Sequence, residues 1–266
     1  MSFIRIYHLT KYYLLTFRNN IGRIILIVFW PFFDLLIWGY TTIYLQTNQN
    51  SENIQSMVAM IIGVFIFWTI VLKAQQEIAA QFNEDIYSKN LSNILISPIK
   101  NSEIIFALIL SSMVKIIIIS LVLIISSYML YSFNLFKINT NFLYPLSILY
   151  LFGWSLGIMV TAIILRFGIK FEFLAWSLAL FLQPFSCVFY PRTTLPYIFN
   201  IISWFIPSSY AFEYLRKIFL NNSYIQIDST NLFFGLIISL LYFLSSIIFF
   251  NYMMKSAKKN GTLARM

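Results

Sequence analysis

The hydrophobic positions of this chain gather into six long runs, which short polar segments separate. The runs are residues 24–45, 57–76, 104–131, 142–165, 171–190 and 230–254. The hydrocarbon core of a bilayer is about 30 Å thick and takes about 20 helical residues to cross, and each run has that length. Strands of a transmembrane barrel would instead give alternating segments of about ten residues. The pattern therefore predicts an all-α polytopic membrane protein with six transmembrane helices, in one domain over 1–266.

The segment before the first run, residues 1–22, is basic and aromatic. Its apolar members include Phe3, Ile4, Tyr7, Leu14 and Phe17, and its cations include Arg5, Lys11 and Arg18. A helix of this composition lies at the membrane interface, with its cations toward anionic headgroups. We therefore expect an interfacial helix here; the alternative is a plain basic flank.

An amphipathic segment, residues 84–98, separates the second run from the third. Tyr87, Leu91, Ile94, Leu95 and Pro98 recur at helical spacing, whereas Glu84, Asp85 and other polar residues fall mainly on the opposite side. The spacing predicts a short helix, which should end just before Pro98. Such a helix either floats on the membrane surface or docks a soluble partner.

Four of the seven prolines lie close together after the start of the fifth run. They are Pro184, Pro191, Pro196 and Pro207, and Tyr190 and Tyr210 lie in the same window. The stretch 195–205 is too apolar for an ordinary loop and too short to span a bilayer. Irregular backbone at membrane depth needs protein or water around it. We expect an outer re-entrant helical hairpin over 191–220, packed against the bundle.

The composition agrees with a membrane protein, because 60% of the residues are hydrophobic and only 10% are charged. A net charge of +9 is compatible with a nucleic-acid partner, but the positions of the cations argue against one. Twelve Lys and Arg residues flank alternate ends of the six runs, and four flank the opposite ends. The positive-inside rule then predicts a multi-pass protein of the bacterial plasma (inner) membrane with both termini in the cytoplasm.

Several kinds of chemistry find no support in the sequence. There is no G-x-x-x-x-G-K-[ST] motif, so the chain by itself is not expected to bind nucleotide as a P-loop protein does. The single cysteine, Cys187, and the single histidine, His8, leave no metal-ligand cluster. No nucleophile has an evident neighbouring base. We therefore expect no catalytic residue, no metal and no cofactor on this chain.

Two charged residues fall deep inside predicted spans: Asp34 in the first and Lys115 in the third. A rise of about 1.5 Å per helical residue puts both about 15 Å deep, where an isolated charge costs at least ~2.5–3.5 kcal/mol. They either neutralise each other or find separate partners. Lys73 and Glu77, at the cytoplasmic end of the second span, are spaced for an i,i+4 pair.

Three motifs resemble the membrane-spanning subunits of ABC-2 type transporters. The first is Gln183-Pro-Phe-Ser-Cys-Val-Phe-Tyr-Pro191, followed by Leu195-Pro196 and by Pro207-x-x-Tyr210-x-x-Glu213-x-x-Arg216, and it includes Ser186. The second is Asn93-Ile-Leu-Ile-Ser-Pro98 with Glu103, and the third is Trp30-Pro-Phe-Phe-Asp-Leu-Leu-Ile-Trp-Gly39. The resemblance covers nearly the whole chain. Cys187 departs from it, because the family often has glycine after the serine.

The resemblance implies that 84–98 is the coupling helix of an exporter and that 191–220 is its outer hairpin. It also implies a dimer, with a second copy or a homologous permease, and a separate ABC ATPase that binds ATP and Mg²⁺. The cargo it implies is amphipathic or polymeric, such as a glycolipid, polysaccharide, lipid or drug.

Three other functions stay open on the residues alone. The first is an ion-coupled secondary carrier that uses Asp34 and Lys115 as a relay, which a neighbouring ATPase reading frame would disfavour. The second is a lipid-modifying membrane enzyme, which needs a convergent polar site. The third is an assembly factor, which would show no nucleotide-dependent conformational change.

Overall fold

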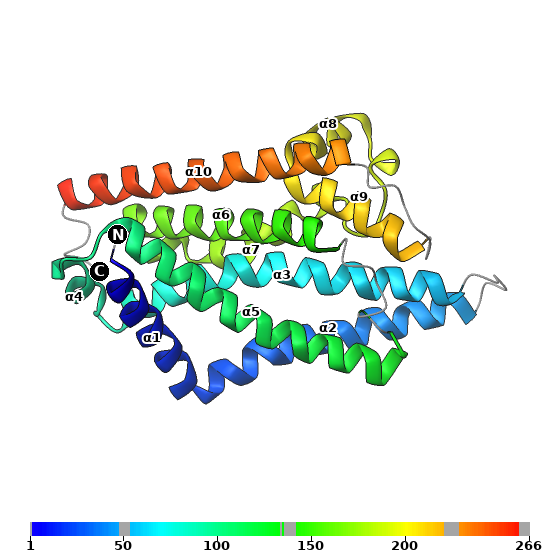
Figure 1. Cartoon of the computed structure of the whole chain (residues 1–266), viewed down its shortest axis with the longest axis horizontal. Coiled ribbons are helices and arrows are strands. Elements are labelled where there is room, and N and C mark those ends of the chain that lie inside the picture. The colour runs from blue at the N-terminus through cyan, green and yellow to red at the C-terminus, as the bar shows by residue number, and fades with distance from the viewer. Residues whose placement is uncertain (1, 48–53, 134, 136–141, 221–228, 261–266) are drawn as a thin grey trace.

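A computed structural model describes residues 2–47, 54–133, 135, 142–220 and 229–260, and this part of the chain is helical, with no strand (Figure 1). The α-helices are α1 (Phe3–Asn19), α2 (Ile21–Thr47), α3 (Ile54–Tyr87), α4 (Leu91–Ile96), α5 (Asn101–Tyr131), α6 (Leu143–Phe167), α7 (Phe173–Leu182), α8 (Tyr197–Phe205), α9 (Pro207–Leu220) and α10 (Ser229–Lys259). Short 3-10 turns are η3 (Ile169–Phe171), η4 (Gln183–Ser186) and η5 (Arg192–Thr194).

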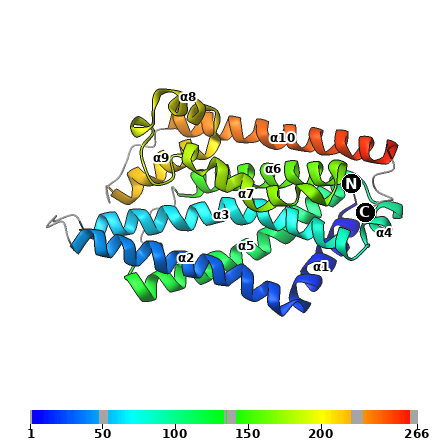
Figure 2. The same cartoon turned by 180° about the vertical axis from the view of Figure 1, so that it is seen from behind.

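The long helices form an elongated bundle, and α3 and α6 lie at its centre (Figures 1 and 2). Helix α6 packs between α3 and α10, and α3 also contacts α2, α5, α7 and α9. Gly153 and Gly157 of α6 face α3, which approaches so closely that a Cβ on Gly153 would lie 2.6 Å from the Cβ of Ala74. Small residues four apart allow helix backbones to approach in this way in lipid. Helices α2 and α10 lie at the periphery and expose apolar side chains.

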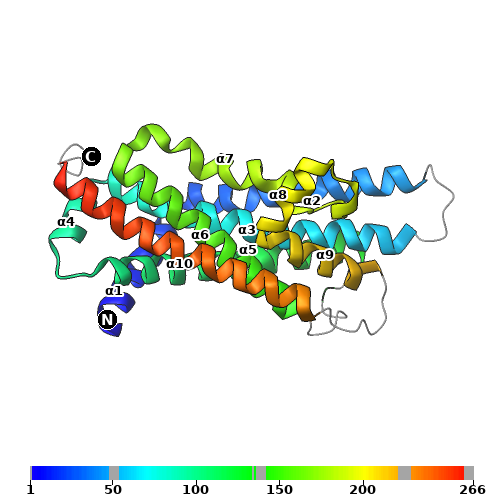
Figure 3. The same ribbon diagram turned by 90° about the horizontal axis from the view of Figure 1, so that it is seen from above.

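Within the described part of the chain, five helices are long and apolar enough to cross a membrane: Ile21–Tyr44, Met60–Tyr87, Asn101–Tyr131, Leu143–Phe167 and Thr230–Lys259. They match five of the six predicted spans. The remaining predicted span, the fifth run 171–190, is not one helix, because the chain passes through η3, the ten-residue α7 and η4. Pro184 near the start of η4 and a left-handed Cys187, with φ of 54°, end the helical path there. Six crossings therefore stay a prediction, although this run follows the bundle lengthwise (Figure 3).

Three other predicted elements take the following forms. The lead-in 1–22 contains α1 and the start of α2. The predicted helix over 84–98 is wrong as a single element, because α3 continues to Tyr87 and α4 covers only Leu91–Ile96. The backbone turns between them at Lys89, which has a φ of 56°. The segment 191–220 holds η5, α8 and α9, and the two helices meet at Ile206 and Pro207 as a hairpin would.

The two ends of the bundle differ (Figure 1). Helix α1 begins, α10 ends and α4 lies at one end, which we call the α4 end, whereas α8 and α9 lie at the other, the hairpin end. The start of α1, the α4 segment, the turn after α6 and the end of α10 meet at the α4 end and carry most of the cations predicted to be cytoplasmic, whereas Arg18 and Arg23 lie on either side of the junction between α1 and α2. Arg192 is in η5, and Arg216 and Lys217 are in α9, at the hairpin end. The remaining two flanking cations, Lys137 and Arg265, lie outside the described residues.

Candidate functional site at the α4 end

The corner formed by the end of α3, by α4 and by the start of α5 (residues 84–103, the α4 corner) has a defined local cause. After the left-handed Lys89, α4 runs for only six residues. Ser97 then adopts an extended conformation, as the residue before a proline prefers. Glu103 closes the start of α5 by accepting a hydrogen bond of 2.9 Å from the backbone N–H of Lys100. The corner is therefore a compact turn between two long helices.

The start of α1 is fastened to this corner. Glu103 accepts a hydrogen bond of 2.7 Å from the backbone nitrogen of Ser2, and its other carboxylate oxygen lies 3.8 Å from a guanidinium nitrogen of Arg5. Arg5 also donates to the carbonyl oxygen of Pro98. Pro98, a predicted site residue, is thus held by α1 through its backbone.

The middle of α1 holds the other side of the corner. The Tyr12 hydroxyl donates to a carboxylate oxygen of Asp85 over 3.1 Å and accepts from the Asn90 amide over 3.0 Å. Tyr13 is fully buried beside them, and burial followed by the Asp85 charge raises the pKa of its hydroxyl well above the usual value. Tyr13 therefore stays protonated at neutral pH. Helix α1 therefore forms hydrogen bonds with the residues before α4 and with those after it.

The face that α4 presents differs from the predicted one. Leu91 and Ile94 are only 5% and 6% exposed, because they pack into a cluster with α1, α3, α5 and α6. Leu95 packs partly against the same cluster. The large apolar side chains that stay exposed are Tyr87 and Ile96, at 58% and 84%. The break at Lys89 rotates α4 relative to α3, and a single-helix spacing cannot anticipate that rotation.

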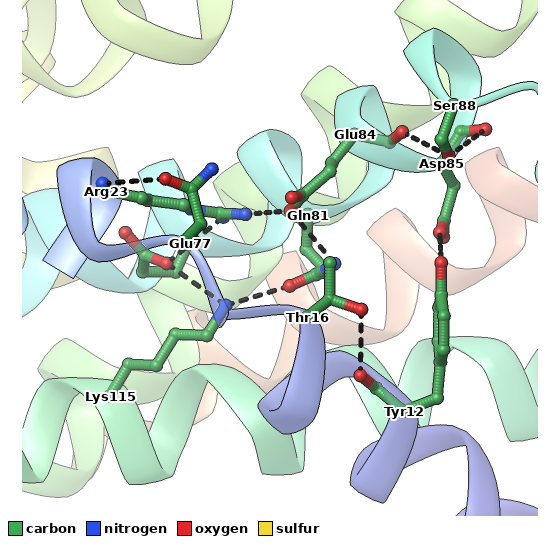
Figure 4. A network of polar contacts seen from close by, with 10 residues as sticks. Tyr12, Thr16, Arg23, Glu77, Gln81, Glu84, Asp85, Ser88 and Lys115 are labelled. Atoms are coloured by element: carbon green, nitrogen blue, oxygen red, sulfur yellow. Dashed lines mark hydrogen bonds and ion pairs between the residues drawn. The ribbon is translucent and has the colours of Figure 1, made fainter. Parts of the chain in front are cut away.

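Beside the corner lies a partly buried cluster of charges from α2, α3 and α5 (Figure 4). The carboxylate of Glu77 lies 3.3 Å from the Lys115 ammonium and 3.5 Å from the Arg23 guanidinium. Lys115 also donates to Gln81 over 2.9 Å, and Arg23 forms an ion pair with Glu84. Cβ atoms tilt toward the start of a helix, so the long Lys115 side chain reaches back toward the α4 end. Paired in this way, the charges tolerate burial.

Of the two alternatives for Asp34 and Lys115, the structure shows separate surroundings, because Lys115 has Glu77 as its partner. Asp34 is exposed on α2 and has no ion-pair partner in the described part of the chain. The i,i+4 pair between Lys73 and Glu77 is also absent there, since Lys73 donates to Gln76 over 3.1 Å. The partners of Lys115 and Lys73 depend on how the helices are rotated, which the sequence spacing does not give.

Gln75 is a residue that the sequence analysis missed. It is fully buried on α3, and its amide nitrogen donates to the carbonyl oxygens of Leu174 and Ala175 over 2.9 and 3.2 Å. Its amide oxygen accepts from the N–H of Ala179 over 2.8 Å. Residues 175 and 179 are the pair that an α-helix joins by its own hydrogen bond. Gln75 thus fixes α3 to the backbone of α7; a buried glutamine in an apolar run was the available signal.

The hairpin end carries the remaining predicted residues. Arg216 donates to the carbonyl oxygens of Cys187 and Tyr190 over 2.5 and 2.7 Å, and lies 3.3 Å from Glu213. Arg216 thus joins α9 to the backbone of residues 187–190, which precede the hairpin segment 191–220. Three of the other predicted residues form hydrogen bonds here: the hydroxyl of Tyr190 donates to the carbonyl oxygen of Pro184, Ser186 accepts from Ser208, and the hydroxyl of Tyr210 donates to the carbonyl oxygen of Trp204. The three predicted prolines mark element starts: Pro191 precedes η5, Pro196 precedes α8 and Pro207 begins α9.

Among the described residues, no group of three or more His, Cys, Asp or Glu side chains is placed to hold a metal ion. What the α4 end offers is mechanical: the α4 corner is tied to α1 by hydrogen bonds and to the bundle interior by the charge cluster. A force applied to α4 would therefore reach α1, α3 and α5 together.

A family model described as ABC-2 type transporter matches residues 6–220, from α1 through α9. No curated protein matches the chain.

Proposed function

The chain belongs to the ABC-2 type transporter family, and on that premise we propose that it is the permease subunit of an ATP-driven exporter, with ATP hydrolysis on a separate ABC ATPase chain. The proposed complex holds two permease subunits, either two copies of this chain or this chain and a homologue. It resides in the bacterial plasma membrane, surrounded by lipid, with the α4 end in the cytoplasm and the hairpin end outside. The cargo class is amphipathic or polymeric.

The observation that carries the proposal is the exposed surface of the α4 corner. Ile96, at 84% exposed, and Tyr87, at 58%, stand out from a corner whose other large apolar side chains pack inward. An exposed apolar side chain on a short helix suits a groove on a soluble partner. The chain carries no P-loop motif, so its energy source would be that partner.

The mechanism follows from how the corner is fastened. ATP-driven closure of the partner would push α4, and the hydrogen bonds to Arg5 and Tyr12 would move α1 with it. The charge cluster would pass the same motion to α2, α3 and α5. Rigid-body rotation of helices about an interface is a standard form of such a switch.

The carrier alternative, with Asp34 and Lys115 as a relay, is weakened because these two residues have different surroundings. It makes a distinct prediction, since an ion-coupled carrier purifies without an ATPase and loses transport when the ion gradient is collapsed. An exporter of the proposed kind co-purifies with an ATPase and needs ATP.

The test is co-purification of a P-loop ATPase with the tagged chain in mild detergent. We expect wild type to retain the ATPase and Ile96→Asp to lose it. The matched control is Ile198→Asp, which alters another exposed isoleucine, 69% exposed, at the hairpin end. Leu91→Asp is unsuitable, because that side chain is buried in the chain's own core. Retention of the ATPase by Ile96→Asp, or its equal loss with Ile198→Asp, would contradict the proposed docking surface.

A further inference from the structure

A cavity of about 210 Å³ lies at the hairpin end, between η5, α8, α9 and the start of α10. Its walls are polar and aromatic, and include Arg192, Trp204, Tyr210, Glu213, Tyr214 and Lys217. Tyr210 and Tyr214 are themselves buried, at 7% and 3% exposed, so these walls are fixed by packing. The cavity has the size of a small polar group and is too small for a drug-sized ligand, which needs about 300 Å³ or more.

The single carboxylate among these residues is already engaged. Glu213 accepts a hydrogen bond of 2.6 Å from the backbone N–H of Arg192, and it lies 3.3 Å from the guanidinium of Arg216. Arg216 does not line the cavity, and its ion pair with Glu213 neutralises that carboxylate. Arg192 and Lys217 are the two cations among the wall residues.

Arg192 is held in a fixed position with hydrogen-bonding capacity to spare. Its guanidinium carbon lies 4.0 Å from the centre of the Trp204 ring and 4.8 Å from that of Tyr210. One terminal nitrogen donates to the Ser209 hydroxyl over 2.7 Å. The Nε atom is buried and has no acceptor among the described residues, and Arg192 forms no ion pair with a described carboxylate. A buried, unpaired donor on a permanent cation is costly unless an anion completes it.

We propose that this cavity binds a phosphate group carried on a small polar head. A guanidinium presents its donors in a planar fork that matches phosphate oxygens. Lys217 adds a second positive charge, and the tyrosine-rich wall surrounds the organic part of the ligand. The phosphate would be that of a membrane lipid head group or of a phosphorylated sugar on the exported molecule. The link to export rests on the proposed function, whereas the binding itself does not.

The test measures the melting temperature of the purified chain in detergent at constant ionic strength. We expect inorganic phosphate and glycerol 3-phosphate to raise it above the value in sodium chloride, and neutral glycerol to leave it unchanged. Arg192→Gln should weaken phosphate binding roughly tenfold or more, because it removes a charge-assisted hydrogen bond. Arg166→Gln, which alters an arginine at the α4 end, should not weaken it.

Arg192 also contacts Ser209 and Trp204, so Arg192→Gln could weaken binding by disturbing the fold. A second variant controls for this effect. Lys217 is exposed on α9, so Lys217→Gln should fold and still bind phosphate more weakly. Tighter binding of glucose 1-phosphate than of glycerol 3-phosphate would identify a sugar head group, and the reverse order a lipid head group. Phosphate that gives no more stabilisation than chloride, or binding unchanged in both variants, would overturn the proposal. Neither result depends on an ATPase, so failure here is separate from failure to co-purify.

Discussion

Among single residues, Glu77 and Lys115 form an ion pair inside the bundle. Glu77 is 4% exposed and Lys115 1%, so each is buried with the other as partner. Removing one member of a buried ion pair costs about 3–5 kcal/mol, because the other charge is left uncompensated. Removing both costs much less. A double-mutant cycle can therefore distinguish the Glu77–Lys115 pair from a pair between Asp34 and Lys115, which their similar depth in the membrane would allow.

We predict strong coupling between Glu77→Gln and Lys115→Met, and additive effects for Asp34→Asn and Lys115→Met. Each single change at Glu77 or Lys115 should lower the free energy of unfolding markedly, and the double variant should recover part of that loss. The measurement is thermal unfolding of the three single variants and the two double variants in one detergent. Coupling between Asp34 and Lys115, with additivity at Glu77, would reverse the assignment.

A second residue-scale prediction concerns Cys187, whose φ of 54° lies in the left-handed region. L-residues pay roughly 1–2 kcal/mol for that conformation, and glycine does not. Cys187→Gly should therefore leave the protein more stable than Cys187→Ala does, although alanine preserves more of the buried side chain. Thermal unfolding of the two variants decides this. A more stable alanine variant would show that backbone conformation is not what limits this position.

At the scale of elements, the sequence predicts the long helices well, because a run of apolar residues of bilayer length leaves few alternatives. It predicts the hairpin too, since Pro196 and Pro207 mark the starts of α8 and α9. The sequence does not predict where the helical path is interrupted. Lys89 and Cys187 turn the chain in a left-handed conformation without the glycine that would signal it. It fails again for Glu77 and Gln75, whose partners depend on helix rotation.

The contact between α3 and α6 gives an element-scale prediction. A Cβ on Gly153 would lie 2.9 Å from the carbonyl oxygen of Val71, and backbone cannot move aside cheaply. Gly153→Ala should destabilise the bundle by about 1–3 kcal/mol. Gly22→Ala is the control, because its nearest atom would be 3.6 Å away. Unfolding temperatures in detergent compare the two; an equal effect would mean that the close approach of α3 and α6 is not needed.

The hydrogen bonds between α1 and the α4 corner give a further prediction about helix packing. Tyr12→Phe removes the hydroxyl that joins Asp85 to Asn90, and we expect faster hydrogen exchange over residues 88–98. Tyr7→Phe serves as control, because Tyr7 is 61% exposed on the other face of α1. Exchange over 88–98 that is unchanged in Tyr12→Phe would show that α1 does not hold the corner.

At the scale of the whole molecule, the two ends of the bundle have different tasks in this account. The α4 end is tied into one unit by α1 and the charge cluster, and it exposes Ile96. The hairpin end carries the cavity around Arg192. The peripheral helices α2 and α10 expose apolar side chains, which suits contact with lipid or with another membrane subunit. Partners and cargo lie beyond what one sequence can specify, because they depend on surfaces of other molecules.

The most direct measurement is thiol cross-linking in native membranes from position 96. The native Cys187 is buried, and a serine there leaves Ile96→Cys as the sole reactive site. Ile198→Cys in the same background probes the hairpin end. The account predicts cross-linking of a P-loop ATPase from position 96 and none from position 198. An ATPase captured from position 198, or none from position 96 while transport activity persists, would contradict it.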